Sequence, residues 1–171
     1  MDKETADKVR GMVRRVTLKN TSDDGQTQRA SIETAEGIWH DDVEILQAYG
    51  VASHAPEDGA VGIAIAVGGD QGDVVVLPVG NPSQRLGGLP PGAVAIYNGR
   101  GDRVVAYPDG RIDIQAGASV TTTVGGVSMT VSAAGVAIVG GTVTHNGRDI
   151  GDTHRHVDVV AGPDLTGPPQ P

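Results

Sequence analysis

The sequence has few aromatic residues and no cysteine. Among its 171 residues there are no Phe, one Trp and three Tyr, so 2% of the chain is aromatic. Aromatic side chains usually supply much of the buried apolar area of a core. This chain must therefore bury apolar area with other side chains. The absence of cysteine excludes a disulfide framework and a thiolate metal site. Val, Ala and Ile supply most of the apolar content, beside 26 Gly, and they suit narrow β packing.

Positive charge is also scarce. The chain has 13 Lys and Arg against 21 Asp and Glu, which gives a net charge of −8. Because nonspecific nucleic-acid binding depends on Lys and Arg contacts to phosphates, we expect no nucleic-acid partner and no electrostatic membrane anchor. The polar start, Met1 to Glu4, lacks the apolar region of a signal peptide. No apolar run has the length that spans a bilayer.

Residues 1–92 predict a small N-terminal barrel of the OB type. A short helix or flexible start occupies residues 1–11. Strand-like segments follow at residues 12–19, 27–33, 43–49, 61–67 and 74–79. Gly-containing turn signals separate them, and five short strands in about 80 residues fit an OB barrel. A β-sandwich is the main alternative. Residues 39–42 are interpreted as a polar loop with one partly buried Trp.

Residues 93–145 predict a β-helical shaft. Two hairpin-like units come first, with turn signals at Asn98-Gly99 and at residues 108–110. Apolar and polar residues then alternate with period two, as in residues 120–124 and 127–132, and Gly pairs interrupt the runs. Isolated hairpins are marginally stable, so we expect an intertwined trimer in which three chains close one another's edges. A disordered low-complexity segment is the alternative.

Residues 146–171 form the predicted apex, which contains His154 and His156. Side chains two apart on an extended segment point the same way. Two imidazoles are too few to hold a metal, but three chains around a threefold axis would supply six. Imidazole suits Fe, Ni, Cu or Zn, whereas Ca and Mg prefer oxygen. Six ligands imply an octahedral site, which disfavours the usually tetrahedral structural Zn. A saturated site of this kind is structural and not catalytic.

Other roles for the histidines have less support. His145 is a candidate for a second ligand ring, although a polar residue at a strand end is the simpler interpretation. Residues 154–158 partly match the HxHxDH motif of metallo-β-lactamase-type hydrolases, but Val159 replaces the last His and no His follows. No Ser-His-Asp or paired-carboxylate arrangement is evident. We therefore predict that the protein is not an enzyme.

The C-terminal motif resembles a known family. It reads Asn146-Gly147-x-x-Ile150-Gly151-x-x-His154-x-His156 and precedes a Gly- and Pro-rich end at residues 162–170. With the barrel and the shaft, it resembles the central spike, or baseplate assembly protein V, of contractile-tailed bacteriophages of the Mu and P2 type. The resemblance implies an all-β homotrimer with an OB-fold and a triple-stranded β-helix. It also implies one iron ion per trimer, held by six histidines. Many members have Pro-Gly soon after the second His, where this chain has residues 157–160.

The resemblance also implies a mechanical function. The protein would be a structural tail spike at the distal end of the virion's baseplate. It would sit on a hub protein through its barrel and pierce the host outer membrane when the sheath contracts. One alternative is the spike of a related contractile injection or bacteriocin system. Another is an OB-type binding module with a flexible tail, which a monomer in solution would favour.

Overall fold

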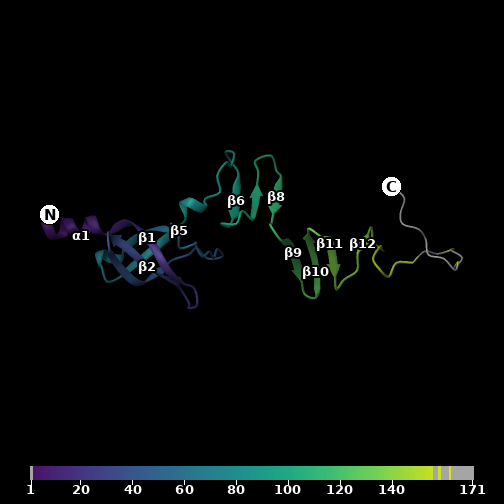
Figure 1. Ribbon diagram of the computed structural model, residues 1–171, viewed down its shortest axis with the longest axis horizontal. Helices are drawn as coiled ribbons and strands as arrows, with labels where there is room; N and C mark the ends of the chain where they lie inside the picture. Colours follow the sequence, from purple (N-terminus) through teal and green to yellow (C-terminus); the bar gives the residue numbers. More distant parts are fainter. Residues whose placement is uncertain (1, 156–157, 159–161, 163–171) are drawn as a thin grey trace. The chain divides into compact units, whose positions relative to one another are not determined.

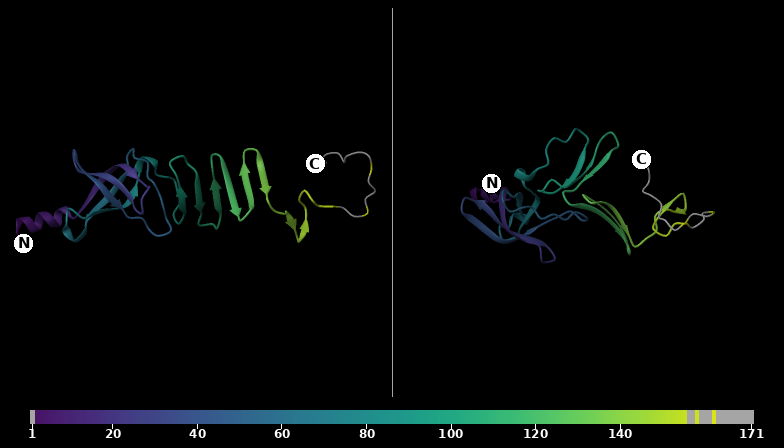
Figure 2. Two further views of the ribbon diagram at one scale, coloured as in Figure 1. Left: turned by 90° about the horizontal axis from the view of Figure 1, so that it is seen from below. Right: turned by 45° about the vertical axis from the view of Figure 1, so that its right-hand side comes forward.

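The computed structural model describes residues 2–155, 158 and 162, and the chain forms two compact units, residues 1–115 and 116–171 (Figures 1 and 2). The first unit contains the barrel and one small sheet, and the second contains another sheet and a short hairpin. The division after residues 92 and 145 that the sequence suggests stays a prediction.

The first unit begins with helix α1 (Lys3–Gly11). The Asp2 side chain caps it by accepting a hydrogen bond of 2.7 Å from the Thr5 amide, which satisfies one of the unpaired N–H groups of the first turn. The start of the chain is therefore a short helix, one of the two predicted possibilities. Nowhere in the described residues is a helix long and apolar enough to cross a membrane.

Five strands form a closed barrel next to this helix (Figure 1). They are β1 (Val13–Ser22), β2 (Gln28–Ala35), β3 (Ile38–Ile45), β4 (Val61–Ala66) and β5 (Val74–Gly80). The order is β1-β2-β3-β5-β4, and β4 pairs again with β1. Every pair is antiparallel except β3 with β5. The predicted five-stranded barrel is confirmed, and the sandwich alternative is wrong.

Strand β3 begins earlier than the sequence suggested. Residues 39–42 belong to this strand and not to a loop, whereas residues 46–49 lie beyond its end.

Lys19 on β1 places its ammonium 3.5 Å from the centre of the half-buried Trp39 ring. Asp42 has a positive φ of 60° where the pairing with β2 shifts register. Arg29 on β2 donates hydrogen bonds to the backbone carbonyl and to the carboxylate of Asp42. The irregular, polar outer half of the strand hid it from a search for alternating hydrophobic residues.

The barrel core is aliphatic throughout. It consists of Val16, Leu18, Ala30, Ile32, Val43, Ile45, Ala60, Ala64 and Val76. Alternate residues of each strand point inward, and side chains of this size fill a narrow barrel without aromatic rings. Gln28 is a buried polar residue, and its amide donates to the Ser53 carbonyl at 3.1 Å. In the part of the chain that the structure describes, no buried side-chain N or O lacks a partner.

A three-stranded sheet completes the first unit. Its strands are β6 (Val94–Tyr97), β7 (Arg103–Ala106) and β8 (Ile112–Gln115), in the order β6-β7-β8. Two 3-10 turns, η1 (Val67–Gly69) and η2 (Pro82–Gln84), flank β5. The predicted turn at Asn98 is confirmed, because its side-chain oxygen accepts the amides of Arg100 and Asp102.

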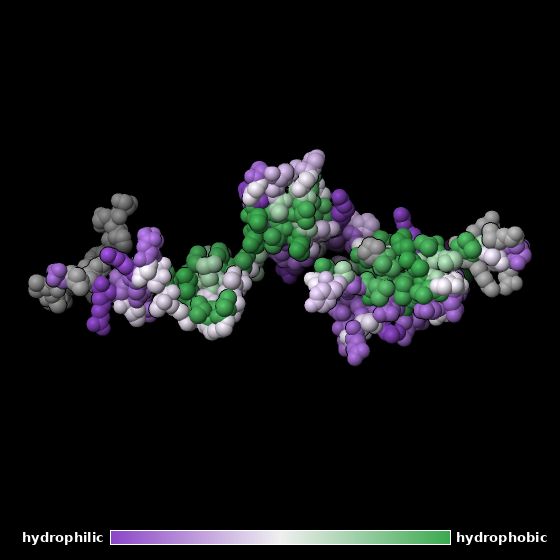
Figure 3. Space-filling model, turned by 180° about the vertical axis from the view of Figure 1, so that it is seen from behind, coloured by the Kyte–Doolittle hydropathy of each residue, from purple (hydrophilic) through white to green (hydrophobic). Residues whose placement is uncertain are grey.

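One face of this sheet is apolar and open to solvent. Paired residues in neighbouring strands share a face. The pairings place on it Val94, Ile96, Val104, Ile112 and Ile114, which are 40 to 78% exposed. We call this set the first apolar face. Figure 3 shows the hydrophobic surface that these strands present.

The second unit repeats the pattern with a more regular sheet. Its strands are β9 (Ser119–Val124), β10 (Val127–Ser132) and β11 (Gly135–Val139), in the order β11-β10-β9. The predicted alternation is confirmed, and the disordered alternative is wrong for these residues. One face carries Val124, Val127, Met129, Val131, Val136 and Ile138, which are 42 to 76% exposed. We call this set the second apolar face (Figure 3).

The opposite face of the same sheet is mostly polar, with the exposed Val139 as its one large apolar residue among those described. It carries Thr121, Thr123, Ser128 and Thr130. The hydroxyls of Thr121 and Thr130 lie 3.0 Å apart and form a cross-strand hydrogen bond. Cross-strand hydroxyl pairs of this kind suit a hydrated surface. The sheet therefore has one apolar face and one mostly polar face, and both are open to solvent in the chain by itself.

Truncating Ile32 to Ala should destabilise the barrel. Ile32 is fully buried, so its replacement should lower the free energy of unfolding by about 2–5 kcal/mol. Ile38→Ala, on the neighbouring strand at 56% exposure, should change it by about 0.5 kcal/mol or less. Denaturant titration of the full chain, followed by the fluorescence of Trp39, measures both. Equal effects would contradict the core assignment.

Candidate metal centre

A short hairpin leads the chain into the histidine motif. Strands β12 (Thr144–His145) and β13 (Arg148–Asp149) pair across a two-residue turn. Both turn residues have positive φ, 50° at Asn146 and 76° at Gly147. Asn-Gly is the preferred sequence for such a turn, because these residues adopt the left-handed region at low cost. The first two residues of the predicted motif therefore reverse the chain.

The carboxylate of Asp149 organises the loop that follows. One oxygen accepts the Gly151 amide at 2.8 Å, and the other accepts the Thr153 hydroxyl at 2.6 Å. These bonds hold the pKa of Asp149 below its ordinary value, chiefly through the Thr153 hydroxyl and then through the Gly151 amide. A Cβ at position 151 would lie 3.2 Å from the same carboxylate, so a larger residue there would push the Asp149 side chain slightly aside.

His154 folds back onto the same loop. Its amide donates to the Gly151 carbonyl at 3.3 Å, and its ring Nδ1 lies 2.6 Å from that oxygen. A carbonyl only accepts, so Nδ1 carries the proton. The neutral ring then has its lone pair on Nε2, which is the form of imidazole that ligates metals. His154 thus fits a metal that prefers nitrogen ligands.

For the other two predicted ligands, His156 and His145, a role at the metal site stays a prediction. His156 lies outside the described residues, so the pairing of the two rings, the octahedral site and the iron ion stay predictions. His145 is exposed on β12 opposite Arg148, and its part in a second ring also stays a prediction. Across residues 2–155 with 158 and 162, no group of three or more His, Cys, Asp or Glu side chains is placed to hold a metal.

Two residues of this loop carry a role that the sequence analysis did not assign. Asp149 and Thr153 occupy unspecified positions of the motif. An Asp two residues before a Gly is a recognised turn pattern, in which the carboxylate binds the amide two residues on. The Asp149-x-Gly151 spacing therefore signalled half of the arrangement. Nothing local signalled the Thr153 bond.

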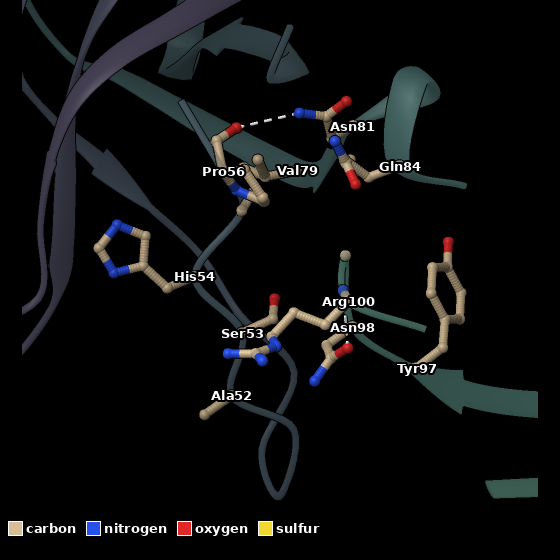
Figure 4. Close-up of a pocket in the computed structure, with 13 residues that line it drawn as sticks. Ala52, Ser53, His54, Pro56, Val79, Asn81, Gln84, Tyr97, Asn98 and Arg100 are labelled. Atoms are coloured by element: carbon tan, nitrogen blue, oxygen red, sulfur yellow. Dashed lines mark hydrogen bonds between the residues drawn. The ribbon is translucent and has the colours of Figure 1, made fainter. Parts of the chain in front are cut away.

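A groove of about 720 Å³ lies elsewhere, in the first unit. Residues 52–56, the end of β5 and the β6–β7 turn line it (Figure 4). Its polar side chains hold the surrounding loops. Asn81 donates to the Pro56 carbonyl at 3.1 Å, and Asn98 donates to Asp102 at 2.8 Å. These amides serve the local fold, and the sequence had marked Asn98 only as part of a turn.

Comparison with known proteins identifies the barrel. Residues 15–83 match the family model for bacteriophage Mu Gp45, N-terminal. The predicted resemblance to the baseplate spike family of Mu-like phages is confirmed. The match covers β1 to β5 and less than half of the chain. The likeness to this phage protein therefore extends over the barrel alone. No curated protein matches the sequence.

Replacing Gly147 by Ala should loosen the hairpin before the motif. A non-glycine residue at φ 76° costs about 1 kcal/mol. The Ile150 amide, which donates to the Val143 carbonyl at 2.8 Å, should then exchange its hydrogen roughly fivefold faster. Gly126→Ala is the control, because Gly126 has an ordinary φ and open space around it. An unchanged exchange rate in Gly147→Ala would contradict the turn assignment.

Proposed function

We propose that the protein is the central spike of a contractile phage tail, which pierces the host outer membrane mechanically. One observation carries the proposal beyond the Mu Gp45 match. Downstream of the matched barrel, two sheets each present an apolar face that the described residues leave exposed. Faces of this kind point to assembly with further copies.

The apolar faces support a homotrimer. Soluble monomers rarely expose continuous apolar patches, and a small sheet with one open hydrophobic face is weakly stable alone. From Ile114 to Gly147 the chain has no Asp, Glu, Lys or Arg. Copies can therefore meet over the second apolar face without burying a charge, which would be costly. The polar face with Thr121 and Thr130 would remain in water.

The trimer would also provide stiffness. A spike transmits the force of sheath contraction and must not buckle under load. Each sheet has backbone N–H and C=O groups at its edge strands, β9 and β11 in the second unit. Pairing of these edges between chains would add hydrogen bonds along the shaft and remove exposed edges. The barrel, which has its own core, would remain free to seat on a hub protein of the baseplate.

The apex would be joined by a metal ion. His154 and His156 from three chains would supply six neutral imidazoles, and the resemblance favours iron. The ion would act as a structural cross-link of three chain ends. The described part of the structure supports this at His154, whose Nδ1 proton is directed to the Gly151 carbonyl. A site with six protein ligands has no open position for a reaction, so the proposed spike is not an enzyme.

A matched pair of threonines tests the trimer. Thr122 pairs with Met129 and so lies on the second apolar face, whereas Thr123 pairs with Ser128 on the polar face. Thr122→Asp should place three charges at the interface and lower the fraction of trimer by at least tenfold at micromolar concentration. Thr123→Asp should leave the trimer intact. Sedimentation velocity gives the mass of each variant.

Either of two results would count against the trimer. The first is a wild-type protein that sediments as a folded monomer with full β signal in circular dichroism. The second is a trimer that tolerates Thr122→Asp and Thr123→Asp equally well. A monomeric wild type would favour a binding module over a spike.

Metal analysis tests the apex. Protein purified without chelator should contain one iron ion for every three chains. His154→Ala combined with His156→Ala should abolish it while the barrel stays folded. Because the ligands must be neutral, the amount of bound metal should fall as the pH is lowered. His145→Ala should keep its metal if His145 is only a strand-end residue. Wild-type protein with far less than this amount of metal would contradict the site.

A further inference from the structure

We infer that Asp149 and Thr153 are positioning residues that present Nε2 of His154 to the metal. The inference rests on the proposed function of the apex and adds residues that the histidine motif leaves unspecified. It follows from four contacts in the loop between β13 and His154.

In the first step, hydrogen bonds to Asp149 hold the peptide groups on either side of Gly151 in one orientation. The Asp149 carboxylate accepts the Gly151 amide on one oxygen and the Thr153 hydroxyl on the other. The Gly151 carbonyl lies in the chain between these two anchor points. Glycine has wide backbone freedom, and the two bonds to one carboxylate remove much of it. The carbonyl therefore keeps one direction.

The second step is the orientation of the imidazole. The Gly151 carbonyl accepts both the amide and Nδ1 of His154. The amide contact fixes the backbone of His154, and the Nδ1 contact fixes the ring rotation and the tautomer. Backbone carbonyls that hold the second nitrogen of a metal-bound histidine are typical of metal sites. Here the carbonyl itself is held by Asp149.

Asp149 acts through the backbone and not as a ligand. Both of its oxygens accept hydrogen bonds from the loop, and its neighbour Asp152 has no such contact in the structure. The same negative charge at position 152 should therefore have no effect on the ring. This difference supplies a matched control.

The experiment measures Ni²⁺ binding to the full-length protein after chelator treatment, by isothermal titration. Asp149→Asn keeps an acceptor for the Gly151 amide but replaces the oxygen that accepts the Thr153 hydroxyl. Thr153→Val removes that hydroxyl at equal size. Both should weaken Ni²⁺ binding about tenfold to a hundredfold. Thr153→Ser, which restores the hydroxyl, and Asp152→Asn should bind as the wild type does.

A second readout separates positioning from a general loss of structure. In the metal-free protein, ¹⁵N spectra of labelled histidine should show His154 as the Nδ1–H tautomer. In Asp149→Asn this preference should shift toward Nε2–H, while the sedimenting mass and the barrel's unfolding midpoint stay at their wild-type values. A purely structural role for Asp149 would change the latter properties and not the tautomer.

The outcomes distinguish this inference from the proposed function. If the wild type binds one Ni²⁺ per three chains and Asp149→Asn and Thr153→Val bind equally well, the positioning role is overturned and the metal centre stands. An Nε2–H tautomer in the wild type would also overturn it. If the wild type binds no more Ni²⁺ than His154→Ala with His156→Ala, the metal centre is overturned, and the positioning role with it.

Discussion

The two apolar faces of the sheets are the constraint on which the proposed architecture depends. A three-stranded sheet can satisfy its backbone hydrogen bonds within one chain, but it cannot bury a hydrophobic face without a second layer. Among the residues that the structure describes, none forms such a layer on the apolar side of β6–β8 or of β9–β11. The faces are large relative to the sheets that bear them, so their burial decides whether these strands persist in water.

The barrel meets the same requirement by another route. Its five strands close on themselves, so each inward side chain has neighbours from the same chain. Short aliphatic side chains suffice because a small barrel has a narrow interior. The scarcity of aromatic residues thus has two consequences. It permits a thin barrel, and it leaves the remaining sheets without the large side chains that would let one chain cover them.

Much of this fold was predictable, because period-two alternation and Gly-containing turns are local signals. They located the strands around Val120 and Met129, and the turns at Asn98 and at residues 108–110. The start of β3 was missed because Asp41 and Asp42 interrupt the alternation and because a contact with Lys19, distant in sequence, supports Trp39. His154 was predicted as a ligand from the spacing of the motif and from the family resemblance, and its role stays a prediction. The contribution of Thr153 was not, since it depends on a hydrogen bond to Asp149 that only a folded loop reveals.

The uncharged segment from Ile114 to Gly147 also affects how the protein is made. Charged residues next to β-prone strands usually protect a growing chain from aggregation. This chain has none across the whole of β9, β10 and β11. During synthesis these strands emerge before the apex, with their apolar side exposed and their edges unpaired. For the proposed trimer, the yield of correctly folded protein should therefore depend on the supply of neighbouring chains, so that slow or sparse synthesis favours misfolded material.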